Sequence, residues 1–177
     1  MLELVYPQVT ASFPILPDLR KSPKLLWLDT GMVNYVVGMQ EELLFSNDAD
    51  ELWNGDIDEH VVGQELLGAS LAFGEKRMFW VRDAKNSQAE VDFLIRFRAH
   101  LIPIEVKTGV NTRLRSLHQF MEESKEKVAL RLWNGPMTSD TIARSGGEPF
   151  TLYNIPIYYA GHLHVFLQRK IGGMAFG

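Results

Sequence analysis

Two hydrophobic runs in the middle of the chain are separated by a short polar break. They lie within residues 88–109, are rich in Val, Ile, Leu and Phe, and are divided by Arg98-Ala99. Runs of this composition that flank a short break are typical of a β-hairpin. The pattern therefore predicts two adjacent antiparallel strands at the centre of the fold.

Charged residues interrupt these runs at regular positions. Because successive side chains of a strand point to opposite faces, Glu105 and Lys107 are expected to share one face. If Phe97 pairs with His100 across a two-residue turn, Asp92 lies opposite Glu105 and shares that face. A three-residue loop would turn Asp92 to the other face, and the turn has neither the Gly nor the Asn that tight hairpins favour. The two-residue register predicts two carboxylates and one ammonium on a single patch of sheet.

The patterns on either side of the hairpin predict an α/β fold. Helical spacing predicts one helix with Ile57, Val61, Val62, Leu66, Leu67 and Leu71 on its apolar face and another with Leu114, Leu117, His118 and Met121. Short apolar runs predict strands at residues 25–29, 77–81 and 128–133. Residues 137–149 are polar and Gly-rich, which predicts a loop. The strand expected after this loop contains Pro156, which predicts that it lies at an edge of the sheet. We expect a central mixed sheet flanked by helices.

The first 24 residues differ from the remainder. They hold four prolines and show little periodicity, which indicates an extended lead-in or linker. We therefore expect an extended segment at 1–24 and one domain at 25–177.

Composition excludes several classes of protein. With 177 residues, 46% hydrophobic and 23% charged, the chain is typical of a single globular domain. No stretch has the apolar length of a membrane span, and the N-terminus does not have the pattern of a signal peptide, so we expect a cytoplasmic protein with no membrane partner. The absence of cysteine excludes disulfides, thiol catalysis and Cys-based zinc sites.

The charge is unevenly distributed. The net charge is −4, yet residues 76–131 carry twelve Lys and Arg against seven Asp and Glu. Such a region could meet a phosphate backbone of DNA or RNA, or it could be an ordinary solvated surface. Arg113 and Arg115, at the start of the second predicted helix, are the candidate phosphate contacts, and mobile surface arginines are the alternative.

The charged patch on the hairpin suits metal-assisted cleavage of a phosphodiester. Carboxylates such as Asp92 and Glu105 are hard oxygen ligands for Mg²⁺ or Mn²⁺. A metal ion polarises the phosphate and lowers the pKa of a bound water, and Lys107 could stabilise the developing negative charge. The alternative is a Glu–Lys pair on a solvated strand, with Asp92 at the end of a turn.

Several motifs resemble known families. Asp92 followed by Glu105-Val106-Lys107 resembles the PD-(D/E)XK nuclease signature. The chain is also similar to an uncharacterised domain often found C-terminal to an AAA+ ATPase module. That similarity rests on residues 24–32, 55–62, 89–93, 102–109, 116–120 and 155–161.

The resemblance implies a restriction-endonuclease-like fold and a Mg²⁺-dependent nuclease site. Asp92 and Glu105 would be metal ligands, and Lys107 the charge stabiliser. Glu59 in Gly-x-x-x-Glu-x-x-Val would be a further acidic ligand on the helix preceding the hairpin, with Glu65 in reserve. The chain contains no phosphate-binding loop of the Gly-x-x-x-x-Gly-Lys-Ser/Thr type, so ATP hydrolysis is not predicted for it. The alternatives are a catalytically inactive module that binds nucleic acid or protein, and a homo-oligomeric structural domain.

Overall fold

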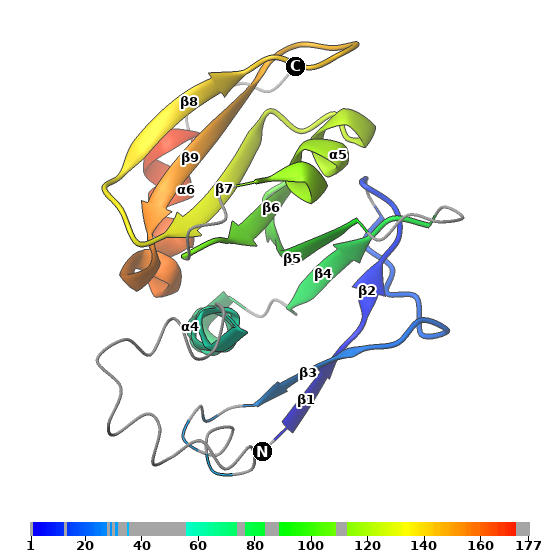
Figure 1. The fold of residues 1–177 in the computed structure, drawn as a ribbon, viewed down its shortest axis with the longest axis vertical. Helices are drawn as coiled ribbons and strands as arrows, with labels where there is room; N and C mark the ends of the chain where they lie inside the picture. The colour runs from blue at the N-terminus through cyan, green and yellow to red at the C-terminus, as the bar shows by residue number, and fades with distance from the viewer. Residues whose placement is uncertain are drawn as a thin grey trace.

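The computed structural model describes residues 2–12, 14–27, 29, 31, 35, 56–73, 77–83, 89–108 and 113–172. Its elements, in chain order, are β1 (Leu2–Val5), β2 (Pro7–Gln8), β3 (Lys24–Trp27), α4 (Asp56–Phe73), β4 (Met78–Val81), β5 (Glu90–Phe97), β6 (His100–Val106), α5 (Arg115–Glu123), β7 (Val128–Trp133), β8 (Thr138–Ile142), β9 (Phe150–Pro156), the 3₁₀ helix η1 (Ile157–His162) and α6 (Leu163–Lys170) (Figure 1).

A mixed sheet forms the centre of the molecule. Seven of the described strands pair in the order β2-β4-β5-β6-β7-β9-β8, and β1 and β3 form a separate antiparallel pair. β4, β5 and β6 are an antiparallel meander, after which α5 carries the chain across to β7, which runs parallel to β6. The expected α/β architecture, a central mixed sheet flanked by helices, is confirmed.

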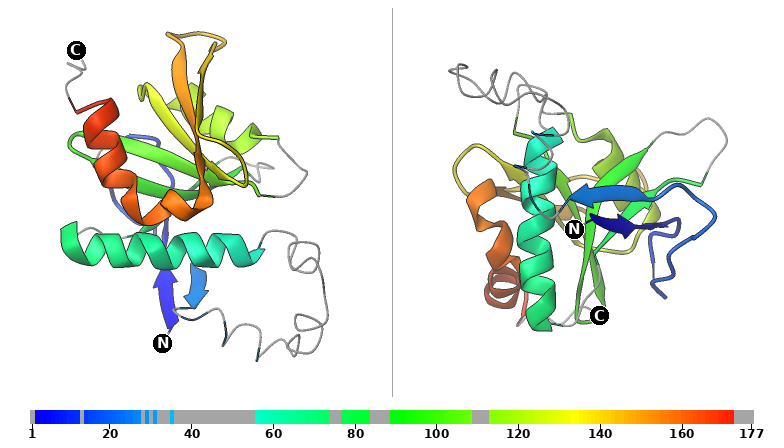
Figure 2. Two further views of the ribbon diagram at one scale, coloured as in Figure 1. Left: turned by 90° about the vertical axis from the view of Figure 1, so that its left-hand side faces the viewer. Right: turned by 90° about the horizontal axis from the view of Figure 1, so that it is seen from below.

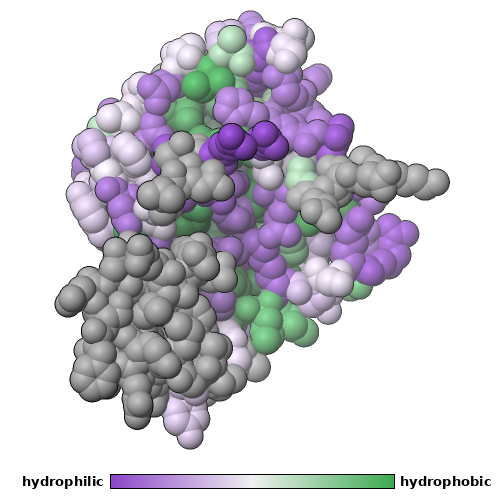
Figure 3. Space-filling view, viewed as in Figure 1, coloured by the Kyte–Doolittle hydropathy of each residue, from purple (hydrophilic) through white to green (hydrophobic). Residues whose placement is uncertain are grey.

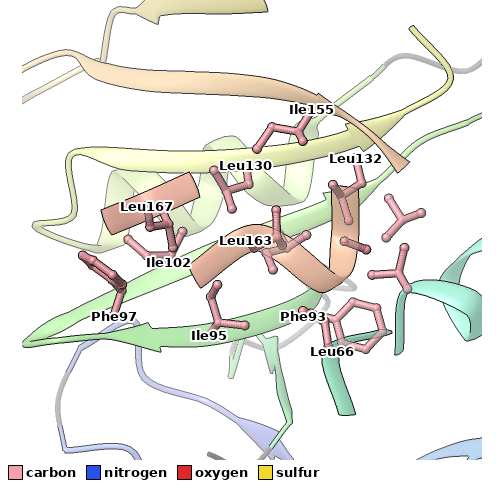
Figure 4. Close-up of a cluster of buried hydrophobic side chains, with 14 of the residues drawn as sticks. Leu66, Phe93, Ile95, Phe97, Ile102, Leu130, Leu132, Ile155, Leu163 and Leu167 are labelled. Carbon is pink, nitrogen blue, oxygen red and sulfur yellow. The ribbon is translucent and has the colours of Figure 1, made fainter. Parts of the chain in front are cut away.

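Helices cover both faces of this sheet. α4, η1 and α6 lie on one side, where the right-hand view of Figure 2 shows α4 and α6 together, and α5 packs on the other. The first core includes Phe93, Ile95, Ile102, Leu130 and Leu163 (Figure 4). The second core is built around Trp80, Leu94, Leu101, Leu117 and Phe120. Alternate residues of the central strands supply the two cores, as the period of a strand requires, except where an irregularity in β5 puts Val91 in the second core.

The helix faces differ in detail from the sequence prediction. On α4, Val62 and Leu66 are buried, whereas Val61 is 37% exposed. On α5, Phe120 is buried with Leu117 and Met121, and His118 is exposed. Each apolar stripe is therefore rotated slightly from the expected one, because the tightest contacts with the sheet select one side of the hydrophobic arc.

The prediction of a loop at residues 137–149 was wrong, because this segment contains β8. β8 pairs antiparallel with β9, and the first four of its five residues are exposed. An edge strand that is exposed on both faces needs no hydrophobic residues, so its pattern resembles that of a loop. β9 is consequently an interior strand and not the predicted edge. Pro156 is tolerated there because it is the last residue of β9, paired with Trp133 of β7.

The segment expected as a lead-in is extended, but it is packed into the domain. β2 pairs in parallel with β4 at the edge of the main sheet, and β1 pairs with β3. Val5 is 2% exposed, and the buried Gln8 side chain donates to the backbone oxygen of Thr10 at 2.7 Å. β1 and β2 are therefore paired with strands that follow them in the chain.

Polar residues predominate on the face viewed in Figure 1, with hydrophobic residues in patches between them (Figure 3). Within the described part of the chain, no helix has the length and apolarity needed to cross a bilayer.

Candidate functional site

The hairpin of β5 and β6 has the predicted register. Phe97 pairs with His100, and the pairing continues to Phe93 opposite Ile104, so the turn consists of Arg98 and Ala99 alone. Arg98 has φ 57°, the left-handed conformation that Gly usually supplies in such turns. Its guanidinium donates to the backbone oxygen of Gly172 at 2.6 Å, which helps to fix the turn.

The three predicted side chains of the hairpin come together at its open end. Lys107 Nζ lies 3.1 Å from Glu105 Oε1, and Asp92 Oδ2 accepts a hydrogen bond from the backbone N–H of Val106 at 2.8 Å. Ile104 and Val106 belong to the core beneath α4, on the opposite face from Glu105. The shared face predicted for Glu105 and Lys107 is confirmed.

A β-bulge lies beside Asp92. Met78 pairs with Leu94 and Trp80 with Val91, so two steps along β4 match three along β5. Bulges re-aim side chains and are common next to functional sites. Here the bulge spans Asp92 and accompanies its hydrogen bond to Val106 of the neighbouring strand.

Glu105 is the most deeply buried carboxylate of the site. It is 4% exposed, and its Oε2 atom is buried without a hydrogen-bond partner. Burial, and then the neighbouring Asp92, raises the pKa of Glu105 to about 7, although Lys107 acts in the opposite direction. Burial also raises the pKa of Asp92 to about 6, with a further contribution from Glu59 and opposition from Lys24.

Lys24 and Glu90 complete the site, and the sequence prediction missed both. Lys24 Nζ, at the start of β3, lies 2.6 Å from Glu59 Oε1, 2.7 Å from Glu90 Oε1 and 3.9 Å from Asp92 Oδ1. Glu59 of α4 is thereby linked to the acids of β5 through one ammonium. The spacing of Glu90 two residues before Asp92 was a usable signal, but Lys24 has none of its own because its partners are distant in sequence.

Both lysines of the site remain cationic. Burial works to lower the pKa of Lys24, but Glu59, Asp92 and Glu90 outweigh it, so the pKa is raised. Burial likewise works to lower the pKa of Lys107, but Glu105 and Asp92 favour its charged form. The pKa of Lys107 is therefore also raised. The site therefore contains four carboxylates and two ammonium groups.

A contact between Thr108 and α4 holds the helix against the end of β6. The Thr108 hydroxyl donates a hydrogen bond to Asp58 Oδ2, the residue that precedes Glu59. The first turn of α4 is thus fixed next to the open end of the hairpin. Glu59, the next residue of this turn, is close enough to Asp92 to raise its pKa.

The remaining predicted residues lie around this centre. Glu65 is exposed and lies against Gly161 of η1, where an added methyl group would meet Glu65 Oε2 at 2.5 Å. Arg113 and Arg115 are exposed at the start of α5. The Ser116 hydroxyl accepts a hydrogen bond from the backbone N–H of Glu90 at 3.3 Å, which places this end of α5 beside the site. That Arg113 and Arg115 contact phosphate stays a prediction.

The carboxylates of the site are the donors that a divalent cation would need. Among the residues that the structure describes, no three His, Asp or Glu side chains are arranged to hold a metal ion. The ammonium groups of Lys24 and Lys107 lie against the carboxylates of the site. In chemistry the set still fits Mg²⁺ or Mn²⁺, since it consists of hard carboxylate oxygens and includes the buried, unpartnered Oε2 of Glu105.

Comparison with known proteins identifies a family. A family model described as a domain of unknown function, DUF4143, matches residues 54–151, more than half of the chain. The matched segment contains Glu59, Glu90, Asp92, Glu105 and Lys107 but not Lys24. No curated protein and no solved structure matches the chain significantly. The chain belongs to the DUF4143 family of domains of unknown function.

Proposed function

We propose that this domain cleaves phosphodiesters with the help of Mg²⁺ or Mn²⁺, as a PD-(D/E)XK nuclease-like domain of restriction-endonuclease-like fold. The supporting observation is the convergence of Asp92, Glu105 and Lys107 at the open end of one hairpin. The similarity to domains that follow an AAA+ ATPase module suggests that it is the C-terminal part of such a cytoplasmic protein.

Each side chain has a role in this proposal. Asp92 and Glu105 would hold the metal ion, with Glu59 as a further acidic ligand from α4. When bound, such an ion polarises the scissile phosphate and lowers the pKa of a coordinated water. Lys107 stabilises the negative charge that develops on the phosphate, at the cost of its pairing with Glu105.

The substrate in this proposal is DNA or RNA. The excess of Lys and Arg between residues 76 and 131 surrounds the acidic centre in sequence. Arg113 and Arg115 stand exposed at the start of α5, whose Ser116 contacts β5 beside the acids. They would bind backbone phosphates, which position a nucleic acid without reading its sequence.

Cleavage of single- and double-stranded DNA and RNA with Mg²⁺ or Mn²⁺ tests the proposal. Lys107→Ala and Asp92→Asn should each lower the rate by about 100-fold or more. Matched controls are Lys127→Ala and Asp83→Asn. In the wild type, Lys127 pairs with Glu148 on the surface and Asp83 pairs with Lys21. Equal cleavage by all five proteins would assign the activity to a contaminant and remove the proposal.

A second candidate function is a non-catalytic module that binds nucleic acid or a partner protein. The observation that favours it is the ammonium of Lys24, which already neutralises part of the acidic cluster. This candidate predicts binding without turnover, and an affinity for nucleic acid that falls steeply with added salt. Salt-insensitive binding to a protein would indicate an interaction module, and sedimentation would show whether the chain forms a homo-oligomer.

A further inference from the structure

Lys24 is held in place from two directions. Its ammonium contacts Glu59 and Glu90 at 2.6 and 2.7 Å and lies 3.9 Å from Asp92 Oδ1. The same ammonium lies 4.9 Å from the ring centroid of Phe79 and 5.9 Å from that of Phe93, within reach of cation–π attraction. The side chain is only 17% exposed. A lysine so enclosed is part of the site and not a solvated surface charge.

The ammonium of Lys24 contacts acids that would also hold a metal ion. Two of its three acidic neighbours, Glu59 and Asp92, are also the side chains that would hold a metal ion. The third neighbouring acid, Glu90, is 42% exposed and stands at the outer side of the cluster. A monovalent ammonium and a divalent cation cannot share the same carboxylate oxygens without strong repulsion.

We propose that Lys24 is an internal counter-ion that competes with a divalent cation for Glu59 and Asp92. In the metal-free protein it holds α4 and β5 together across their like charges. Glu90 keeps hold of the ammonium when a divalent cation takes the other two acids. The inference rests on the proposed function for the choice of a metal ion as the competing ligand.

The flexible stem of lysine makes such an exchange feasible. Four carbons separate the ammonium from the backbone of β3, so rotation about the side-chain bonds can move the charge without moving the strand. The backbone of β3 is paired with β1 along the whole strand, from Leu2 opposite Trp27 to Val5 opposite Lys24. Exchange therefore requires a change of rotamer and no change of fold.

Binding of Mn²⁺ to the full chain at alkaline pH, followed by calorimetry, tests the proposal. Lys24→Met should bind Mn²⁺ about tenfold more tightly than wild type, because one competing positive charge is gone. Lys21→Met is the matched control: it removes a lysine three residues away that pairs with Asp83 outside the cluster, and its affinity should stay that of wild type. Equal or weaker binding by Lys24→Met would overturn the proposal.

A measurement on the wild type guards against a variant that fails to fold. Titration with Mg²⁺, followed by side-chain NMR of ¹⁵N-labelled lysine, should shift the ammonium resonance of Lys24 and leave that of Lys21 unchanged. A Lys24 resonance that does not move on saturation would overturn the proposal. Glu90→Gln should weaken Mn²⁺ binding, because the displaced ammonium loses the carboxylate that retains it.

These readouts separate this inference from the nuclease proposal. Tighter Mn²⁺ binding by Lys24→Met without any cleavage would end the nuclease proposal and support the competition. Cleavage that persists while wild type and Lys24→Met bind Mn²⁺ equally would support the nuclease proposal and overturn the competition. Failure of both proteins to bind Mn²⁺ would overturn the competition and the metal site together.

Discussion

At the scale of single residues, the buried Glu105 and the half-buried Glu126 show how the site differs from the scaffold. Glu126 has both oxygens satisfied: Oε1 accepts from the backbone N–H of Leu101 at 2.9 Å, and Oε2 lies 2.9 Å from His100 Nδ1. Glu105 has Lys107 on one oxygen and no partner on the other. A buried carboxylate oxygen that lacks a hydrogen-bond partner costs free energy, and natural proteins tolerate this cost mainly at functional positions.

Glu105→Gln should therefore stabilise the protein at pH 8 by about 1–2 kcal/mol, a common gain when a functional charge is removed. The variant no longer needs to ionise a group whose pKa burial raises to about 7, and this outweighs the lost pairing with Lys107. At pH 5 the wild-type carboxyl is already neutral, so the difference should nearly vanish. Urea unfolding at the two pH values measures both effects.

Glu126→Gln serves as the comparison for that variant. It removes a charge whose oxygens are both hydrogen-bonded, so stability should fall by about 1–3 kcal/mol. A Glu105→Gln protein that is less stable than wild type at pH 8 would show that the pairing with Lys107 is worth more than the burial of the charge costs.

The same local physics decides which site residues a sequence can reveal. Asp92, Glu105 and Lys107 lie in one hairpin, where strand alternation places Glu105 and Lys107 on one face and the two-residue turn sets the register of β5 against β6. Glu59 follows from a motif on a helix whose position relative to the sheet no pattern gives. Lys24 reaches the acids through the pairing of β3 with β1 and its packing against α4, which are non-local contacts. No local pattern encodes them.

At the scale of elements, the position of α4 depends on a glycine. A methyl group on Gly63 would lie 3.2 Å from Leu26 Cδ1, 3.3 Å from Phe93 Cζ and 3.4 Å from Arg77 Nη1. Arg77 also donates to the backbone oxygen of Gly63 at 2.5 Å. The helix can approach β3 and β5 closely only because this residue has no side chain, and Glu59, one turn earlier, is brought to Lys24 as a result.

Gly63→Ala should destabilise the protein by about 1–2 kcal/mol despite the higher helix propensity of alanine, because Leu26, Phe93 and Arg77 are buried and cannot easily yield. Gly68→Ala in the same helix is the matched control: nothing lies within 4 Å of the added methyl group. It should stabilise by up to about 1 kcal/mol. Thermal unfolding of both variants measures the contrast, and an equal gain in both would show that α4 packs more loosely than its contacts indicate.

The longer elements with a buried face were predictable, whereas the two-residue strand β2 and the exposed strand β8 were not. β5, β6 and α5 have strong hydrophobic patterns because each packs against a core. β8 is exposed on both faces and reads as a loop, and this error made β9 appear to be an edge strand. The bulge in β5 lies between Met78 and Trp80 of the partner strand, so it depends on a pairing that β5 alone does not encode.

At the scale of the whole molecule, the N-terminal segment is tied to the part of the chain that the family model matches. Arg77, whose side chain is 2% exposed, forms an ion pair with Glu3 of β1 and donates to Gly63 of α4. Lys24 adds a second tie to α4 through Glu59. Both ties converge on the region around the site, so the N-terminal strands contribute to its geometry as well as to the fold.

Glu3→Gln should lower the free energy of unfolding by about 1–2 kcal/mol, because it leaves the buried guanidinium of Arg77 without its counter-charge. The loss is less than for a fully buried pair, since Glu3 itself is 36% exposed. Glu148→Gln breaks an exposed pair with Lys127 and should change stability by less than about 0.5 kcal/mol. Urea unfolding distinguishes the two, and an unchanged Glu3→Gln protein would show that the N-terminal strands are held by packing alone.

The acids of the site should also set how the stability of the whole protein depends on pH. The pKa values of Asp92 and Glu105 are raised, to about 6 and about 7, from ordinary values of 3.8 and 4.5. The folded protein therefore binds protons more tightly than the unfolded chain over this range, so stability should fall as pH rises from about 4 to about 7. The lowered pKa of Asp18 makes stability depend on pH below this window. The raised pKa values of Lys24 and Lys107 do so above it.

Melting temperatures measured in EDTA should accordingly decrease across that window and level off near pH 8, and the double variant Asp92→Asn/Glu105→Gln should flatten the profile. Saturating Mg²⁺ should restore much of the lost stability at pH 8 but not at pH 5, where protons already neutralise the same two carboxyls. Stability that rises in EDTA between about pH 4 and about pH 7 would mean that Lys24 and Lys107 offset the burial of these acids completely.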